Sequence, residues 1–212
     1  MRLWGAATPR TFRPIWAACE LELEFEHLPL GSRTGETQTE EFTALNASQK
    51  IPVLEDGDFV LRESGAIVNY LGSRYGNLVP TDVEQRARYD SWSCFVLMEL
   101  DAHTLYIVRK HRDLASIYGE APKAIDAAYE GFDRMIRVPA REFEDGRPYL
   151  LGEEFSGADI LLGSCLSWAD AYDAPLPESL RPYDERLRTR PAFQRAFDLN
   201  YETRPEISPF KS

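Results

Sequence analysis

The chain has 212 residues, 43% of them hydrophobic and 28% charged, which is typical of one large or two small globular domains. Its formal charge is −11. An acidic chain does not displace counterions from the phosphates of a nucleic acid, so it lacks this source of affinity and nucleic acid is not an expected partner. No apolar run approaches the ~20 residues that cross a bilayer, and no long apolar segment follows Met1, so we expect a cytoplasmic protein with no membrane contact.

The first part of the chain mixes strand and helix signals. Apolar residues recur at helical spacing from Phe12 to Leu23, whereas residues 24–30 alternate as a strand does. The expected elements are a strand at 3–5, a helix at 11–22, a strand at 24–30, a loop at 31–39, a short helix at 40–44, strands at 51–54 and 59–61, and a helix from Ser64 to Tyr75. This order predicts a small mixed sheet flanked by helices.

A proline stands near the start of the third strand, in Ile51-Pro52-Val53-Leu54. Proline cannot donate to a ladder, so it indicates an edge strand, a turn or a bulge, and it is the residue type at which a cis peptide bond is plausible. An edge strand open at Ile51, beside a helix N-terminus at Ser64, could bind an extended peptide that carries a carboxylate.

Residues 77–83 form a linker, and the rest of the chain is expected to be helical, at 84–112, 121–144, from Ser156 onward and from about 191 to 200. At the third of these helices, Ser156 and Asp159 predict a capping box, with Phe155 packed on Ile160. This motif is structural and carries no chemistry. The predicted domains are therefore 1–76 and 84–212.

Three motifs in this order are similar to those of the glutathione transferase superfamily, and the resemblance covers nearly the whole chain. They are Ile51-Pro52-Val53-Leu54 with Glu63-Ser64, the first-helix segment from Thr8 to Leu21, and Phe155-Ser156-Gly157-Ala158-Asp159-Ile160. The resemblance implies an α+β thioredoxin-like domain followed by an all-α helical domain, glutathione as co-substrate, and a homodimer. It is to the Ser-type theta, delta and phi branch, with Thr at the matching position.

Thr8 matches the position of the hydroxyl that activates glutathione in this family. A hydroxyl that donates to the ligand sulfur at a helix N-terminus lowers the pKa of the thiol from its free value of about 8.5. Thr11 is the alternative. Because Pro14 is tolerated in the first turn of a helix, we expect the helix to be capped near Thr11, which leaves Thr8 free to face the ligand.

The glutathione-binding residues that the resemblance implies are Gln49, Lys50, Ile51, Pro52, Glu63 and Ser64. Ser64, at a helix start, would hold the γ-glutamyl carboxylate and Glu63 its ammonium group. The backbone of Ile51 would pair with the cysteinyl unit as an added strand. The acidic chain can still bind this anion because a local patch of basic residues overrides the net field: Arg10, Arg13 and Lys50.

A second, apolar substrate is expected against residues of both domains, namely Phe12, Tyr106, Lys110, Trp168 and Tyr172. His103 and His111 lie two helical turns apart on one face, but no third ligand stands at a recognisable spacing, so no metal site is predicted. Aromatic side chains at Trp92 and Phe95 with Met98 could form an exposed stripe for the dimer, or face the core of their own domain.

The sequence predicts a glutathione transferase that attacks an electrophile with the thiolate of glutathione. The first alternative is a binding protein of the same fold that carries apolar ligands with little turnover. The second is a glutathione-dependent isomerase or ether-cleaving enzyme, which shares the thiolate. A thiol reductase is disfavoured because neither position 8 nor position 11 is Cys, and the three cysteines, Cys19, Cys94 and Cys165, have no paired spacing.

Overall fold

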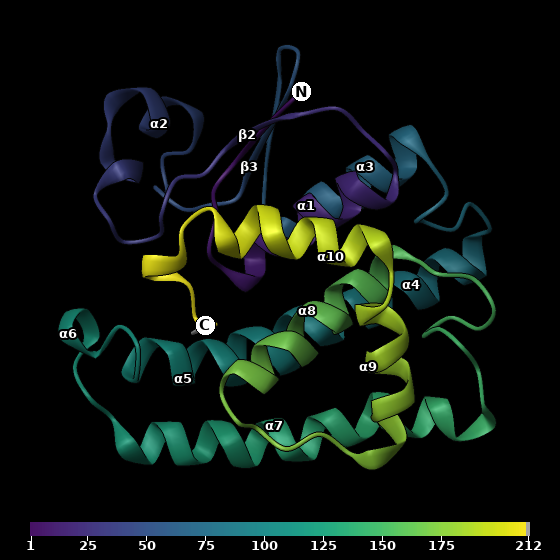
Figure 1. Cartoon of the computed structure of the whole chain (residues 1–212). Coiled ribbons are helices and arrows are strands. Elements are labelled where there is room, and N and C mark those ends of the chain that lie inside the picture. Colours follow the sequence, from purple (N-terminus) through teal and green to yellow (C-terminus); the bar gives the residue numbers. More distant parts are fainter. Residues whose placement is uncertain (211–212) are drawn as a thin grey trace. The chain divides into compact units, whose positions relative to one another are not determined.

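The computed structural model describes residues 1–210 and consists of two compact units. The first comprises Met1–Val79 together with the described residues from Leu187 onward, and the second is Pro80–Arg186 (Figure 1). The first unit therefore includes a segment from the end of the chain, which the predicted boundaries assign to the helical domain.

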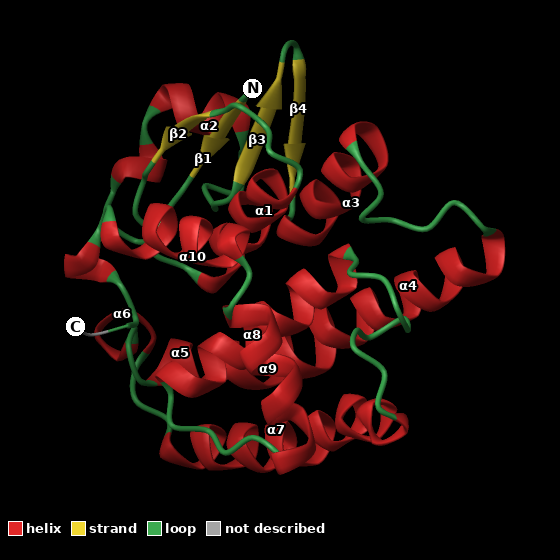
Figure 2. Cartoon of the chain, turned by 45° about the vertical axis from the view of Figure 1, so that its right-hand side comes forward, coloured by secondary structure: helices red, strands yellow, loops and turns green. Residues whose placement is uncertain are grey.

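The first unit contains a four-stranded mixed sheet in the order β2-β1-β3-β4 (Figure 2). The strands are β1 (Arg2–Trp4), β2 (Glu26–Leu28), β3 (Val53–Asp56) and β4 (Phe59–Arg62). β2 runs parallel to β1, whereas β3 is antiparallel to both of its neighbours. The predicted order of elements is confirmed, with the strand expected at 24–30 shortened to three residues.

Of the three placements that Pro52 indicated, an edge strand, a turn or a bulge, the edge strand is wrong, because β3 is an inner strand. Val53 pairs with Trp4 on one side and with Arg62 on the other. Ile51 and Pro52 come before these first pairs, so the missing N–H of the proline removes no ladder hydrogen bond. The Ile51–Pro52 peptide bond is cis.

Helices α1 (Pro9–Glu20) and α3 (Ser64–Tyr75) pack against each other beside the sheet, and α2 (Glu40–Leu45) follows the short 3-10 turn η1 (Glu36–Gln38). Phe42 of α2 meets Trp4 edge to face, with ring centroids 5.9 Å apart, in a cluster that also includes Val53. Since Trp4 and Val53 are opposite each other in the ladder, this cluster forms on one face of the sheet.

The end of the chain packs along α1 through aromatic side chains. Helix α10 (Pro191–Phe197) lies beside α1 in the first unit and continues into the π-helical turn η5 (Asp198–Glu202). The rings that meet here are Phe12, Trp16, Phe193, Phe197 and Tyr201. Phe12 and Trp16 are fully buried, so this cluster is part of the hydrophobic core of the first unit.

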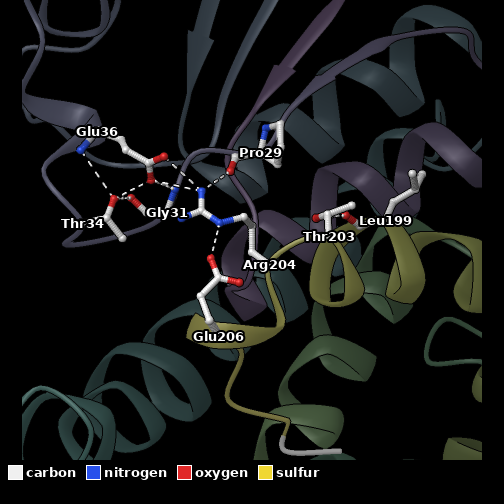
Figure 3. Close-up of polar contacts among 8 residues, drawn as sticks. All are labelled: Pro29, Gly31, Thr34, Glu36, Leu199, Thr203, Arg204 and Glu206. Atoms are coloured by element: carbon white, nitrogen blue, oxygen red, sulfur yellow. Dashed lines mark hydrogen bonds and ion pairs between the residues drawn. The ribbon is translucent and has the colours of Figure 1, made fainter.

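Arg204, which follows η5, binds the segment before α2 through hydrogen bonds (Figure 3). Its Nη1 donates to the Pro29 carbonyl at 2.9 Å and to both carboxylate oxygens of Glu36 at 3.1 Å. Glu36 in turn accepts from the Gly31 amide and the Thr34 hydroxyl. The side-chain hydrogen bonds from Thr34 and the backbone hydrogen bond from Gly31, assisted by Arg204, hold the pKa of Glu36 below its usual value.

The second unit is helical. A nearly continuous helix runs through α4 (Val83–Phe95), the π-helical η2 (Val96–Leu105) and α5 (Tyr106–His111), and α7 contacts both η2 and α5. The helices that follow are α6 (Ala115–Tyr118), α7 (Pro122–Glu142), α8 (Gly157–Ala171) and α9 (Arg181–Arg188), with 3-10 turns η3 (Phe143–Asp145) and η4 (Glu178–Leu180). Within residues 1–210, no helix is both long and apolar enough to span a membrane.

The predicted capping box of α8 is confirmed. The Asp159 carboxylate accepts from the Ser156 amide at 2.8 Å and from its hydroxyl at 2.9 Å. It also accepts from the Leu150 amide and the Tyr183 hydroxyl, at 2.8 and 2.9 Å. These hydrogen bonds satisfy the fully buried carboxyl group of Asp159. Through them, Asp159 links the start of α8 to α9 and to the loop that precedes α8.

Candidate functional site

Helix α1 begins at Pro9, and Thr8 is its N-cap. Oγ1 of Thr8 accepts from the Thr11 amide at 3.0 Å, and the Thr8 amide donates back to Oγ1 of Thr11 at 3.2 Å. The expected cap near Thr11 is therefore wrong, because Thr11 is the third residue of the helix and the second partner of a capping box. Pro14 stands inside the helix, where the lost hydrogen bond is offset by this box and by Pro9 at the first position.

Asn200 of η5 completes this arrangement. Oγ1 of Thr11 donates to Oδ1 of Asn200 at 2.6 Å, while Nδ2 of Asn200 donates to the Thr8 carbonyl at 3.1 Å. Asn200 and Thr11 are fully buried, and Thr8 retains 5% of its surface. Nothing in the sequence pointed to Asn200, since its partners lie about 190 positions away.

The loop before Pro52 is held by a buried asparagine, Asn46. Its Oδ1 accepts from the Ser48 amide and its Nδ2 donates to the Lys50 carbonyl at 2.7 Å. Gln49 has a φ of 56°, a left-handed conformation, and both Gln49 and Lys50 are exposed. The loop thus presents two polar side chains to solvent just before Ile51.

Gly5 brings the Ile51 segment close to α1. A β-carbon at Gly5 would lie 2.6 Å from both Cβ of Ile51 and Cγ2 of Thr11, and Gly5 has a φ of 112°. Only glycine fits this point. The structure therefore places the start of α1, with Thr8 and Thr11, against the residue that precedes the cis proline.

The start of α3 is joined to α1 by Arg13. Nη1 of Arg13 donates to Oγ of Ser64 at 3.2 Å, and both residues are buried. Arg13 was expected to belong to a local basic patch with Arg10 and Lys50; its side chain is fully buried and residues 11–19 are all buried, whereas Lys50 is exposed.

Glu63 precedes Ser64 in a strained conformation, with a φ of 68° and a ψ of 118°. Its side chain is exposed. Strain at a non-glycine residue beside a helix N-terminus is typical of ligand-binding sites. Around the first half of α1, the structure thus brings together Thr8, Thr11, Ile51 and, through Arg13, Ser64.

The residues predicted for the second substrate fall in both units and are described separately. In the first unit, Phe12 is fully buried in the aromatic cluster. In the second, Trp168 and Tyr172 are buried, and the Tyr172 hydroxyl donates to Asp113. Tyr106 and Lys110 are half-buried, and the Lys110 ammonium lies 5.0 Å from the centre of the Tyr118 ring.

The three cysteines are free thiols, of which Cys94 is exposed. Burial raises the pKa of Cys19 to about 11, which disfavours its thiolate at neutral pH. Among the residues that the structure describes, no three His, Cys, Asp or Glu side chains are grouped to hold a metal ion.

Two family models match the chain. The glutathione S-transferase N-terminal domain matches residues 1–73, and the glutathione S-transferase C-terminal domain matches residues 122–198. The sheet with its helices and the helical unit after it have the architecture of this family. The chain belongs to the glutathione transferase superfamily, and the predicted fold class is confirmed.

The similarity to individual proteins agrees with this assignment. The chain is 29% identical to glutathione S-transferase 1 of Manduca sexta, over 75% of this chain and 71% of that protein. It is also 29% identical to a probable maleylacetoacetate isomerase of Vibrio cholerae, over 93% of this chain and 94% of that one. It spans only about three fifths of the mammalian theta-class relatives that it matches.

Among solved structures, a theta-class glutathione S-transferase from Xanthomonas axonopodis pv. citri, with glutathione bound, has a TM-score of 0.77. It is 29% identical to this chain, and the match covers 92% of this chain and 95% of that one.

Proposed function

We propose that the chain is a glutathione transferase that binds glutathione on its first unit and stabilises the thiolate through the Thr8 hydroxyl. The observation that carries this proposal is the capping geometry at Thr8. Its oxygen serves as the cap by accepting from the Thr11 amide, so its own proton is not needed for the cap. That proton can be donated to a ligand sulfur.

The Thr8 hydroxyl also lies at the N-terminus of a 12-residue helix, whose dipole favours negative charge. A donated hydrogen bond and this dipole both stabilise the thiolate relative to the thiol, so the pKa of the bound thiol falls and its proton leaves to solvent. The sulfur lone pair then forms the bond to the electrophilic carbon, while a leaving group departs with its bonding electron pair or, in an activated alkene, the π pair shifts to the neighbouring atoms and is protonated from solvent. The protein holds the two reactants together and stabilises the charge, and no covalent bond to the chain forms.

The predicted binding residues belong to the same unit as this hydroxyl. Ser64 at the N-terminus of α3 would hold the γ-glutamyl carboxylate, with Arg13 behind it as a buried cation, and Glu63 would pair with the ammonium group. The backbone of Ile51, which precedes the ladder of β3, would pair with the cysteinyl unit. The exposed Gln49 and Lys50 are left for the glycyl carboxylate.

The test is a calorimetric titration with glutathione at neutral pH, combined with the ultraviolet thiolate absorbance across pH. Binding with a thiol pKa at least one unit below the free value of about 8.5 is expected for a transferase. Binding with an unshifted pKa would favour the ligand-carrying alternative. An absence of binding would overturn the proposal.

A glutathione-dependent isomerase is the second candidate, favoured by the likeness to the Vibrio cholerae isomerase along nearly the whole chain. Both reactions begin with attack by the thiolate. Conjugation consumes one glutathione per product, whereas isomerisation releases the thiolate again and leaves the glutathione concentration unchanged. Measuring glutathione against product with an electrophilic alkene and with a cis-enone acid therefore separates the two.

The homodimer stays a prediction from the resemblance, and the cytoplasmic location stays a prediction from the composition of the chain. A homodimer would use the stripe on the long helix of the second unit, where Met98 is 48% exposed and Trp92 and Phe95 are half-buried. Light scattering at several protein concentrations would measure the mass. A monomer at all concentrations would contradict the dimer, and secretion of the native protein would contradict the cytoplasmic location.

A further inference from the structure

Asn200 makes three hydrogen bonds to the segment that presents Thr8. Its side chain accepts from the Thr11 hydroxyl at 2.6 Å and donates to the Thr8 carbonyl at 3.1 Å. Its backbone carbonyl accepts from the Ala7 amide at 2.7 Å. All four residues belong to the first unit, although Asn200 comes from the end of the chain.

These bonds hold the backbone before Thr8 in an uncommon conformation. Ala7 has a φ of 55°, in the left-handed region that residues with a β-carbon rarely occupy. Such a conformation persists where surrounding contacts over-determine it. The bonds from Asn200 to residues on both sides of the Ala7–Thr8 peptide supply these contacts, so Asn200 sets the direction in which Thr8 leaves the loop.

The protons of the two threonine hydroxyls can also be assigned. Thr11 has one hydroxyl proton and three acceptors in reach. Oγ1 of Thr8 is the farthest at 2.9 Å, and the two nearer ones are Oδ1 of Asn200 at 2.6 Å and the Thr8 carbonyl at 2.8 Å. Since Nδ2 of Asn200 already donates to that carbonyl, the Thr11 proton is directed to Oδ1. Oγ1 of Thr11 is then an acceptor for the Thr8 hydroxyl at 2.9 Å.

In this arrangement the Thr8 proton is the one that can change partner. It can leave the neutral Thr11 oxygen for a thiolate, which is the stronger acceptor because it is charged. If Asn200 were absent, the Thr11 proton would compete for the Thr8 carbonyl and the Ala7–Thr8 backbone would lose its anchors.

We propose that Asn200 is a positioning residue for the glutathione chemistry, which aims the Thr8 hydroxyl at the ligand sulfur from the C-terminal segment. The inference rests on the proposed role of Thr8. It assigns to the turn η5 a part in thiolate stabilisation in addition to its part in the hydrophobic core.

The turn η5 is well anchored for this task. Tyr201, the next residue, is buried among Phe12 and Phe197, and Arg204 holds the chain on its other side to Glu36 (Figure 3). Arg204 supplies a matched control. It lies four residues after Asn200 and fixes the same segment to the same unit, but its hydrogen bonds go to Pro29, Glu36 and Glu206 instead of to Thr8 or Thr11.

The experiment measures the pKa of glutathione bound to the full-length protein, from the thiolate absorbance across pH. The variants are Asn200→Ala, the near-isosteric Asn200→Asp, and the control Arg204→Gln, each also combined with Thr8→Val. We expect Asn200→Ala to raise the pKa of the bound thiol by about one unit, which is a tenfold loss of thiolate at a fixed lower pH. The affinity for glutathione should change less than about threefold. Arg204→Gln should leave the pKa of the bound thiol unchanged.

The combination with Thr8→Val separates positioning from a general structural or charge effect. An Asn200 substitution should shift the thiol pKa more when Thr8 is present than in the Thr8→Val background, for Asp as well as for Ala, so that an unfolded Ala variant leaves the test intact. Equal shifts in both backgrounds, or a shift of the same size with Arg204→Gln, would overturn the role of Asn200 alone. No effect of Thr8→Val itself would overturn the proposed role of Thr8 and this inference with it.

Discussion

Nη1 of Arg13 donates a hydrogen bond to Oγ of Ser64 at 3.2 Å, and this bond joins the second turn of α1 to the first residue of α3 inside the first unit. No surface of Arg13 is exposed, so its charge acts at short range on the N-terminus of α3. Ser64 is the first residue of this helix, and Glu63, in its strained conformation, is the N-cap residue. A buried cation behind a helix N-terminus strengthens its attraction for a carboxylate, because both the ion and the dipole favour negative charge there.

Replacing Ser64 with Ala together with Glu63→Gln should therefore weaken glutathione binding at least tenfold, or about 1.4 kcal/mol. The double variant removes one contact to the γ-glutamyl carboxylate and the charge opposite its ammonium group. Calorimetric titration measures the loss. As a control, Glu22→Gln removes an acidic side chain elsewhere in the first unit and should leave the affinity unchanged; an unchanged affinity in the double variant would refute the site.

Thr8→Ala and Thr11→Ala should separate the two candidate hydroxyls. Thr8→Ala removes the proposed donor and should raise the pKa of the bound thiol and slow conjugation. Both variants break the capping box and should lower stability by roughly 1 kcal/mol, so stability alone does not distinguish them. If the thiol pKa rises more with Thr11→Ala than with Thr8→Ala, Thr11 is the activating residue.

The cysteines should differ in their reaction with iodoacetamide. Burial raises the pKa of Cys19 to about 11, which means that the protonated, unreactive thiol prevails up to that pH, whereas Cys94 is exposed. At pH 8, mass spectrometry of digested protein should find Cys94 alkylated first and Cys19 at least tenfold more slowly, since the thiolate is the reactive form. Equal rates in the folded protein would contradict this order.

His27 should make the stability depend on pH. Burial lowers the pKa of His27 below its ordinary value of 6.5, and Nε2 of this residue lies 3.0 Å from the Gly5 carbonyl, to which the neutral ring donates. Because the unfolded chain binds the proton more readily, the contribution is fully present above the unfolded pKa and is lost as the pH falls through the lower folded pKa. When the pH is lowered from 7 to 5, the Tm of the His27→Gln variant should fall by about 2 °C less than the Tm of the unchanged protein. An equal fall in both proteins would contradict the prediction.

Arg190→Gln should destabilise the first unit by about 1–3 kcal/mol. Arg190 donates to both carboxylate oxygens of Glu20, at 2.6 and 2.7 Å, and the Glu20 side chain is only 9% exposed. Without Arg190, this carboxylate keeps its bond from Trp16 but loses its cation. Urea unfolding measures the change, and adding Glu20→Gln should recover part of it. Fully additive losses would show that the pair is not coupled.

Local signals in the sequence predicted the elements well. Ser64 begins α3, the Ser156–Asp159 box begins α8, and the order of strands and helices in the first unit is as expected, because each depends on residues within a few positions of one another. The N-cap of α1 was predicted near Thr11, three residues after the observed N-cap, Thr8. The prediction relied on the rule that proline is disfavoured inside a helix and passed over the capping box that the sequence also offers at Thr8 and Thr11.

The sequence by itself determined the superfamily, the succession of elements and the glutathione motifs, since all of these rest on short-range patterns. Tertiary structure alone decided that β3 is an inner strand, that Arg13 is buried against Ser64, and that Asn200 holds the loop of Thr8. The physical reason is that a hydrogen bond between residues about 190 positions apart leaves no period or motif in the chain. It depends on the packing of the aromatic side chains of α10 and α1, which brings η5 to the start of α1.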